Sequence, residues 1–295
     1  MANMTGTTLA SYLAEVWSPK VSVTYRAKTV LVPLMDHRWE PELGVGMGDT
    51  VNVAGFTQNT GAANRGAGTG TFGTGATLTF TANTEAQTQI KVDRFYYMAD
   101  RRPLEMDGQV MPALNPLLAA GRGQAIALQV DADLAADNTN GLDAFSTVVG
   151  TDNVDVTEDD LITIQTNLNN QNAPDSDRYL VVSPATFASI IKIEAIRNQL
   201  YAPAIGSLSG NAGQGFVGGP VYSLMVFMSN NLESGSNGKK NAGFHTEAIA
   251  FIEQMSTQTL QDVNIEDGGF RQFLTFQTCG FKEIKDAFGN ELDGK

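Results

Sequence analysis

The chain has 295 residues, of which 42% are hydrophobic, enough for a substantial core in one or two domains. Charged residues make up 17% of the sequence, below the ~25% of ordinary soluble domains, and the formal net charge is −13. This composition argues against a groove that grips nucleic acid tightly, because no basic cluster offers counterion release.

The cysteine count and the hydropathy pattern narrow the class further. Cys279 is the one cysteine, so no disulfide framework forms within the chain. No apolar run approaches the ~20 residues that cross a bilayer, and no secretory signal opens the sequence. We therefore expect a soluble protein made in a reducing cytoplasm.

The first predicted element is an amphipathic helix over residues 7–16. Leu9, Tyr12, Leu13 and Val16 follow the i, i+3, i+4, i+7 spacing of one helical face, and Ser18-Pro19 ends the pattern. A helix this short is unstable alone in water, so its apolar stripe must dock on its own domain or on a neighbouring subunit.

Residues 49–98 predict a long two-stranded finger. Residues 54–76 are rich in glycine and threonine and cannot form a core of their own. Strict alternation at 77–82 indicates a half-buried strand, and 89–98 continues as a second extended run. An isolated ribbon is marginal in water, so this finger must lie over something larger.

A helix of about 113–138 is the longest predicted element. Small residues and leucines recur along one face of it, which we expect to be its packing seam. The seam comprises Leu114, Leu118, Gly121, Ala125, Leu128, Ala132 and Ala135. Arg122, Gln124 and Gln129 lie on the opposite face, and Asp131, Asp133 and Asp137 are expected to form a solvated or interface surface.

A small α/β domain is predicted next. Thr157 caps a helix whose buried stripe is Leu161, Ile164 and Leu168, and residues 178–182 form a short buried strand. Ser183-Pro184 opens another helix. Its apolar face comprises Phe187, Ile190, Ile191 and Ile196.

The remaining segments are expected to be mainly extended. Residues 221–232 predict one strand, and residues 245–254, 259–267 and 269–284 predict strands that return to a sheet.

No constellation of residues in the sequence would run a reaction. His37 and His245 lack partners at metal-ligand spacing, and Cys279 lies in an apolar strand typical of a structural thiol. Ser189 and Lys192 have the Ser-x-x-Lys spacing of acyl-transfer enzymes, but the partner motifs of that chemistry are missing. We therefore expect no catalytic residues, no metal and no cofactor.

The order of several segments resembles that of major capsid proteins of tailed bacteriophages with the Hong Kong 97 fold. The resemblance covers nearly the whole chain, and the order of the segments is its specific part. The segments are Val16-Trp17-Ser18, GDTVNV at 48–53, the finger, DADLAAD at 131–137, RYLVVSPATFASI at 178–190, GFVGGPVYSLMVFMSNNL at 215–232 and HTEAIAFIEQ at 245–254.

The resemblance implies an α+β Hong Kong 97-type capsid fold with four parts. These are an N-arm at 1–30, an extended β-hairpin loop at 49–98, a peripheral domain at 31–48, 99–141 and 236–295, and an axial α/β domain at 142–235. The helix of about 113–138 would be the spine of the peripheral domain. The loop at 201–219 would lie near the centre of a hexamer or pentamer.

The implied function is that of a structural protein that self-assembles into hexamers and pentamers of an icosahedral phage head around double-stranded DNA. Some members of the family weld their shells with a lysine of the extended loop, but residues 54–89 contain no lysine, so we expect a non-covalent shell. The expected partners are other copies of the chain, a separate scaffolding protein, a portal protein and decoration proteins. Location in the virion, after assembly in the host cytoplasm, follows from the same resemblance.

Eight residues are predicted to contact neighbouring subunits. They are Leu9, Tyr12, Leu13, Trp17, Arg65, Phe72, Phe80 and Tyr201. Three alternatives stay open at the level of sequence: an encapsulin-like compartment shell of the same fold, a secreted or surface-layer β-rich protein, and a hydrolase with an unrecognised site. Genes for cargo enzymes beside this one would favour the compartment, and labelling by a serine-reactive probe would favour the hydrolase.

Overall fold

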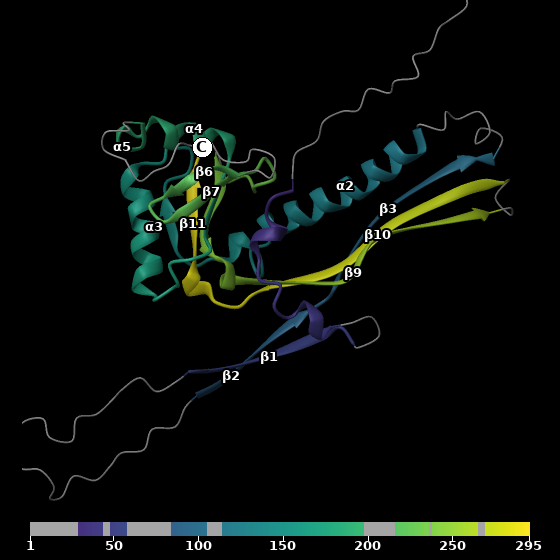
Figure 1. The fold of residues 1–295 in the computed structure, drawn as a ribbon, viewed down its shortest axis with the longest axis horizontal. Helices are drawn as coiled ribbons and strands as arrows, with labels where there is room; N and C mark the ends of the chain where they lie inside the picture. Colours follow the sequence, from purple (N-terminus) through teal and green to yellow (C-terminus); the bar gives the residue numbers. More distant parts are fainter. Residues whose placement is uncertain are drawn as a thin grey trace, which may run out of the picture.

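The structure is a computed structural model of the chain, and it describes residues 29–43, 48–57, 84–104, 114–197, 216–235, 238–264 and 269–295. The predicted helix at 7–16, the predicted strand at 77–82 and residues 201–215 of the predicted loop 201–219 lie outside the described residues. The last four residues of that loop belong to a strand instead. The described part contains a six-stranded sheet, a three-stranded sheet and a two-stranded hairpin (Figure 1).

The six-stranded sheet has the strand order β4-β11-β8-β5-β7-β6. Its strands are β4 (Val148–Gly150), β5 (Arg178–Val182), β6 (Phe216–Val221), β7 (Leu224–Met228), β8 (Lys239–His245) and β11 (Gly289–Gly294). The pairs β4–β11 and β5–β7 are parallel, and the other neighbours are antiparallel. The accompanying helices are α3 (Glu158–Asn170), α4 (Pro184–Lys192) and the short α5 (Glu194–Arg197).

The two predicted helix starts of this region are confirmed. Thr157 and Asp160 form a reciprocal capping box at the start of α3, and the Ser183 hydroxyl accepts a hydrogen bond from the Thr186 N–H at the start of α4. The predicted stripe of α3 is also confirmed, because Leu161, Ile164 and Leu168 are all fully buried against the sheet.

Two details of the same region were predicted wrongly. Ile191 was expected to be buried but is 40% exposed, because α4 packs mainly through Ile190. The segment 221–232 is not one strand. Tyr222 and Ser223 both adopt left-handed backbone conformations, with φ of 48° and 65°, and this tight turn joins β6 to β7 as a hairpin.

The three-stranded sheet is long and has the order β3-β10-β9. It consists of β3 (Arg94–Pro103), β9 (Ile249–Asn264) and β10 (Phe270–Glu283), all antiparallel to their neighbours. The predicted runs 245–254 and 259–267 are therefore merged largely into the one strand β9. The long helix α2 (Leu114–Ala136) lies alongside β3 and β10, as Figure 1 shows.

The existence of α2 is confirmed, but its predicted packing face is wrong. The buried side chains are spaced four residues apart and include one that was assigned to the opposite face. They are Arg122, Ile126, Val130 and Leu134, together with Asp131 and Ala135. Of the predicted seam, only Ala135 is buried among the residues whose burial the structure describes, because the larger apolar side chains of Ile126, Val130 and Leu134 fill the space against the sheet.

The finger is a hairpin of β1 (Thr50–Thr57) and β2 (Thr84–Lys91), paired from Thr50 with Lys91 to Thr57 with Thr84. The predicted second run 89–98 is divided, because Val92 and Asp93 separate β2 from β3, and β3 pairs with β10 instead. At this crossing Gly280 of β10 approaches the carbonyl oxygen of Lys91 so closely that a Cβ at this position would overlap with it.

The last segment of the chain is shared between the two larger sheets. Residues 236–295 were assigned as a whole to the peripheral domain, yet β8 and β11 lie in the six-stranded sheet, and only β9 and β10 lie in the three-stranded one. Short 3₁₀ turns make the two crossings, η6 (Thr246–Ala248) between β8 and β9 and η7 (Asp286–Phe288) between β10 and β11.

One hydrophobic core joins the six-stranded sheet to the three-stranded sheet and α2. Val130 and Leu134 of α2 share it with Phe244 of β8, Phe251 of β9 and Phe281 of β10. The turns η2 (Val32–Leu34) and η4 (Leu142–Ala144) border this core, while η3 (Glu40–Glu42) contacts β9. A smaller cluster fastens the base of the finger to the start of β9 through Val51, Ile90 and Ile252. Since these parts share cores, they form one folded body.

Candidate subunit-contact surface

The three-stranded sheet has one face toward α2 and one face away from it. Successive side chains of a strand point to opposite faces, so the pairing register assigns each residue to a face. Asp100 and Phe273 lie opposite each other on the α2 side, where Arg122 contacts both. The other face, called the outer face below, comprises Phe95, Tyr97, Ala99, Arg101, Gln258, Leu260, Asp262, Gln272, Leu274 and Phe276.

The outer face carries large apolar side chains that the described chain leaves open to solvent. Tyr97 is 65% exposed, and Phe95 and Leu260 are each 56% exposed. The Phe95 ring stacks on the rings of Tyr97 and Phe276, with centroids 5.9 and 5.6 Å apart. Clusters of exposed aromatic and aliphatic side chains are typical of surfaces that contact another molecule.

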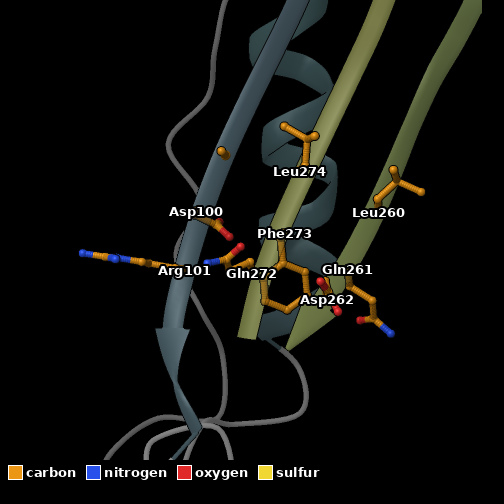
Figure 2. A pocket seen from close by; sticks show the side chains of 9 residues that line it. Asp100, Arg101, Leu260, Gln261, Asp262, Gln272, Phe273 and Leu274 are labelled. Carbon is orange, nitrogen blue, oxygen red and sulfur yellow. The ribbon is translucent and has the colours of Figure 1, made fainter. Parts of the chain in front are cut away.

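A shallow, open groove of about 670 Å³ lies at the far part of this sheet. Figure 2 shows Leu260 and Leu274 on neighbouring strands, with Arg101 on β3 at the other side. Leu260 and Leu274 supply apolar contact area, while Arg101 and Asp262 supply polar groups at its rim. This combination of an apolar centre and a polar rim fits a protein contact.

On the α2 side, a partly buried ion pair joins the helix to the sheet. The Arg122 guanidinium is 4% exposed, donates to the Asp100 carboxylate at 2.7 Å and lies over the Phe273 ring at 4.9 Å. Arg102 lies over the same ring at 5.0 Å. These contacts join α2 to the covered face of the sheet, directly behind the outer face.

Asp131 fixes the point at which the N-terminal segment reaches the body. Its side chain is fully buried, and its oxygens accept from the backbone N–H of Val30 at 3.0 Å and of Leu31 at 2.8 Å. Asn231 donates a third, longer bond of 3.3 Å. Burial raises the pKa of Asp131, opposed by these donors. The expected solvated role of Asp131 is therefore wrong, because its carboxylate serves buried backbone donors.

The residues once considered for chemistry have structural surroundings. Burial raises the pKa of the Cys279 thiol to about 12, which disfavours the reactive thiolate. The Ser189 hydroxyl donates to Asp155 at 2.9 Å, and Lys192 pairs with the same carboxylate at 3.6 Å instead of serving Ser189. Within the described ranges, no group of three or more potential ligands could hold a metal ion.

The predicted contact residues cannot be placed on this surface. Leu9, Tyr12, Leu13, Trp17, Arg65, Phe72, Phe80 and Tyr201 all lie outside the described residues. The contact candidates that sequence reasoning missed are Phe95, Tyr97 and Leu260. A signal was present in the run Phe95-Tyr96-Tyr97-Met98, which is apolar on both faces of its strand and therefore indicates a sheet covered on both sides.

Comparison with known proteins assigns the chain to a family. The sequence model of a family described as phage capsid protein matches residues 104–277, more than half of the chain. The chain belongs to the phage capsid protein family. It is a structural major capsid protein, and its place is in the capsid of the virion.

Solved structures confirm the fold along nearly the entire chain. A structure from Mycobacterium phage Che8 is 19% identical in sequence, with a TM-score of 0.74. The superposition covers 95% of this chain and 97% of the Che8 chain. The capsid structure of Cyanophage P-SCSP1u is 16% identical, with a TM-score of 0.71, and the match covers 100% of this chain and 97% of the cyanophage chain. The mature capsid of bacteriophage PhiM1 is 11% identical, with a TM-score of 0.69, and the match covers 96% of this chain and 92% of the PhiM1 chain.

These matches confirm the predicted α+β fold of the Hong Kong 97 type and the resemblance to major capsid proteins of tailed phages. No curated protein sequence matches the chain. Among the helices that the structure describes, none has the length and apolar character needed to cross a bilayer.

Proposed function

We propose that copies of this capsid protein assemble into hexamers and pentamers, and that these form an icosahedral head around double-stranded DNA. The observation that carries the proposal is the outer face of the three-stranded sheet. An apolar surface with Tyr97 65% exposed is unfavourable in water, and a neighbouring copy would cover it.

The domain roles follow the two sheets. We assign the axial domain to the six-stranded sheet with α3, α4 and α5, and the peripheral domain to α2 with β3, β9 and β10. The hairpin of β1 and β2 is assigned to the base of the extended loop, and the N-arm is assigned to residues 1–30. The eight contact residues proposed from the sequence lie in the N-arm, the extended loop and the loop after α5.

The acidic character of the chain suits a container for DNA. With a net charge of −13, the shell wall would repel the phosphate backbone, so packaged DNA would be enclosed without specific binding. Isolated shells should therefore show no strong, salt-sensitive affinity for DNA, which a filter-binding titration at several salt concentrations would measure.

The shell is proposed to be held by non-covalent contacts, since residues 54–89 contain no lysine to form a side-chain crosslink. A denaturing gel of mature heads should then show single chains, and a ladder of linked chains would contradict the proposal. Assembly would take place in the host cytoplasm with a separate scaffolding protein and a portal protein. Decoration proteins are a further class of partner for the outside of the shell.

Electron microscopy of the purified chain, with and without the co-expressed scaffolding protein, tests the proposed function directly. Closed shells are expected for the wild type. Tyr97→Asp should reduce their yield at least tenfold, because it places a charge in the apolar outer face. Asn138→Asp adds the same charge at an exposed turn next to α2 and serves as the matched control. Equal shell yields from both variants would show that the outer face is not a contact surface.

A further inference from the structure

The three-stranded sheet ends at β9, and the free edge of β9 is covered along only half of its length. In the first half, Phe251 N–H donates to the Asp36 carbonyl at 2.9 Å, and the Gln254 side chain donates to the Gly48 carbonyl at 2.7 Å. From Ser256 to Val263 every residue is exposed. No described strand pairs with that part of the edge.

The open half of β9 lacks the features that normally prevent strands from pairing. Exposed edges are usually protected by lysines, prolines or short length. Ser256–Val263 contains neither lysine nor proline, and its one charge is Asp262. The opposite edge strand, β3, carries Arg94, Arg101 and Arg102 and ends at Pro103. The two edges of one sheet therefore differ, and β9 is the one suited to accept another strand.

We propose that β9 pairs antiparallel with β9 of a second copy of this chain, centred on Leu260, so that two three-stranded sheets become one continuous sheet. This inference rests on the proposed shell assembly and names one contact within it.

The sequence of β9 is self-complementary in this register. Leu260 faces Leu260 of the second copy, and on each side Gln258 faces Asp262, so an amide can donate to a carboxylate. A centre at Gln261 would instead place Leu260 against Asp262, and a centre at Asp262 would oppose two like charges. All three side chains lie on the outer face, so the pairing also joins the apolar surfaces of the two copies.

Cysteine crosslinking tests the register. Leu260→Cys should give a disulfide-linked dimer when assembled shells are mildly oxidised, because directly opposed side chains meet the distance requirement. The natural Cys279 is buried, so the background is low. Gln258→Cys is the matched control. Its symmetry mate would lie four residues along the strand, about 13 Å away, too far for a disulfide. Shells assembled from a mixture of Gln258→Cys and Asp262→Cys chains should crosslink.

Charge substitutions provide a second test that needs no cysteine. Gln258→Glu places two carboxylates opposite each other and should lower assembly yield severalfold at low salt, while Gln258→Glu combined with Asp262→Lys should restore it.

The outcomes separate the pairing from shell formation. Leu260→Cys shells that form without a disulfide-linked dimer, or equal crosslinking of the Leu260→Cys and Gln258→Cys variants, would overturn the pairing and leave the proposed function intact. If the wild-type chain forms no shells, the proposed function fails, and crosslinking of the unassembled chain then decides the pairing in the same way.

Discussion

The two large sheets of this capsid protein differ in how completely their own chain covers them. The six-stranded sheet has α3 and its neighbours on one face and the shared core on the other, so that Leu180 and Val181 of β5 are both 0% exposed. In the part of the chain that the structure describes, α2 covers one face of the three-stranded sheet. Its outer face leaves Phe95, Tyr97 and Leu260 more than half exposed.

This difference separates the surfaces that fold the subunit from the surface that would join subunits in the proposed shell. The six-stranded sheet, which is covered on both faces, stabilises the folded chain, since burial of apolar surface drives folding. The exposed outer face of the three-stranded sheet contributes little to the folding of its own chain, and in the proposed shell its burial would stabilise the assembly. Substitutions in the two regions should therefore affect different measurements.

The largest loss of subunit stability is expected from a substitution in the six-stranded sheet. Leu180→Ala removes a fully buried side chain and should lower the free energy of unfolding by about 2–5 kcal/mol. Urea titration of the unassembled chain measures this loss. Leu260→Ala makes the same side-chain change in the three-stranded sheet and serves as the control. It should change the free energy of unfolding by no more than about 0.5 kcal/mol. Similar losses from both variants would remove the distinction between the regions.

A somewhat smaller net loss is expected at Asp131, which joins the N-terminal segment to α2, because replacing it also relieves the desolvation cost of a buried carboxylate. Asp131→Ala leaves the buried amides of Val30 and Leu31 without their acceptor, and each unsatisfied buried donor costs about 1–3 kcal/mol. Asp131→Asn keeps the shape and one acceptor oxygen, so its cost should be lower. Hydrogen exchange at the Leu31 amide should accelerate in the Ala variant, and unchanged protection there would contradict this role.

Local signals in the sequence predicted local structure well. The Thr157 cap, the Ser183-Pro184 start and the stripe of Leu161, Ile164 and Leu168 depend on neighbours within a few residues, and the structure has all of them. The order of such elements was sufficient for the fold family, because it needed no knowledge of which strands pair.

Features that depend on distant partners were harder to predict. The packing face of α2 was wrong because the sheet it packs against comes from β3 and β10, and Arg122 is buried there only because Asp100 pairs with it. The division between β2 and β3 was missed because Arg94 pairs with Cys279, far along the chain. The outer face was missed for the same reason, since an exposed strand face exists only once the covered face is known.

A smaller, pH-dependent effect is expected at the crossing from β10 to β11. Burial and contact with Asp286 raise the pKa of Glu283 from 4.5 to about 7, with Lys282 opposing, and one buried oxygen of Glu283 has no partner among the described residues. Between pH 4.5 and 7 the unfolded chain releases this proton while the folded chain retains it, so stability falls as pH rises through that window.

Glu283→Gln carries no such proton, so relative to wild type it should gain stability between pH 4.5 and 8. We expect a gain on the order of 1 kcal/mol, after allowing for partial solvent screening. Thermal unfolding at pH 4.5 and pH 8 measures the gain, and Asp293→Asn, which removes a carboxylate of the neighbouring strand segment β11, serves as a control. An unchanged difference between wild type and Glu283→Gln at the two pH values would contradict the assignment.

The smallest effect on subunit stability is expected at Tyr97, which is the most exposed aromatic residue of the outer face and is proposed to contact a neighbouring copy. Tyr97 is 65% exposed and its closest aromatic contact is the stacked ring of Phe95, so Tyr97→Ser should change the free energy of unfolding of the unassembled chain by only about 0.5 kcal/mol. The same variant should reduce the yield of shells, since a covered aromatic residue often dominates a protein interface. Unfolding by urea and counting of shells by electron microscopy can be done on one preparation. If Tyr97→Ser lowered the stability of the unassembled chain strongly but left the yield of shells unchanged, the subunit would be covering its own outer face. The outer face of the three-stranded sheet would then stabilise the fold of the subunit and not the assembly.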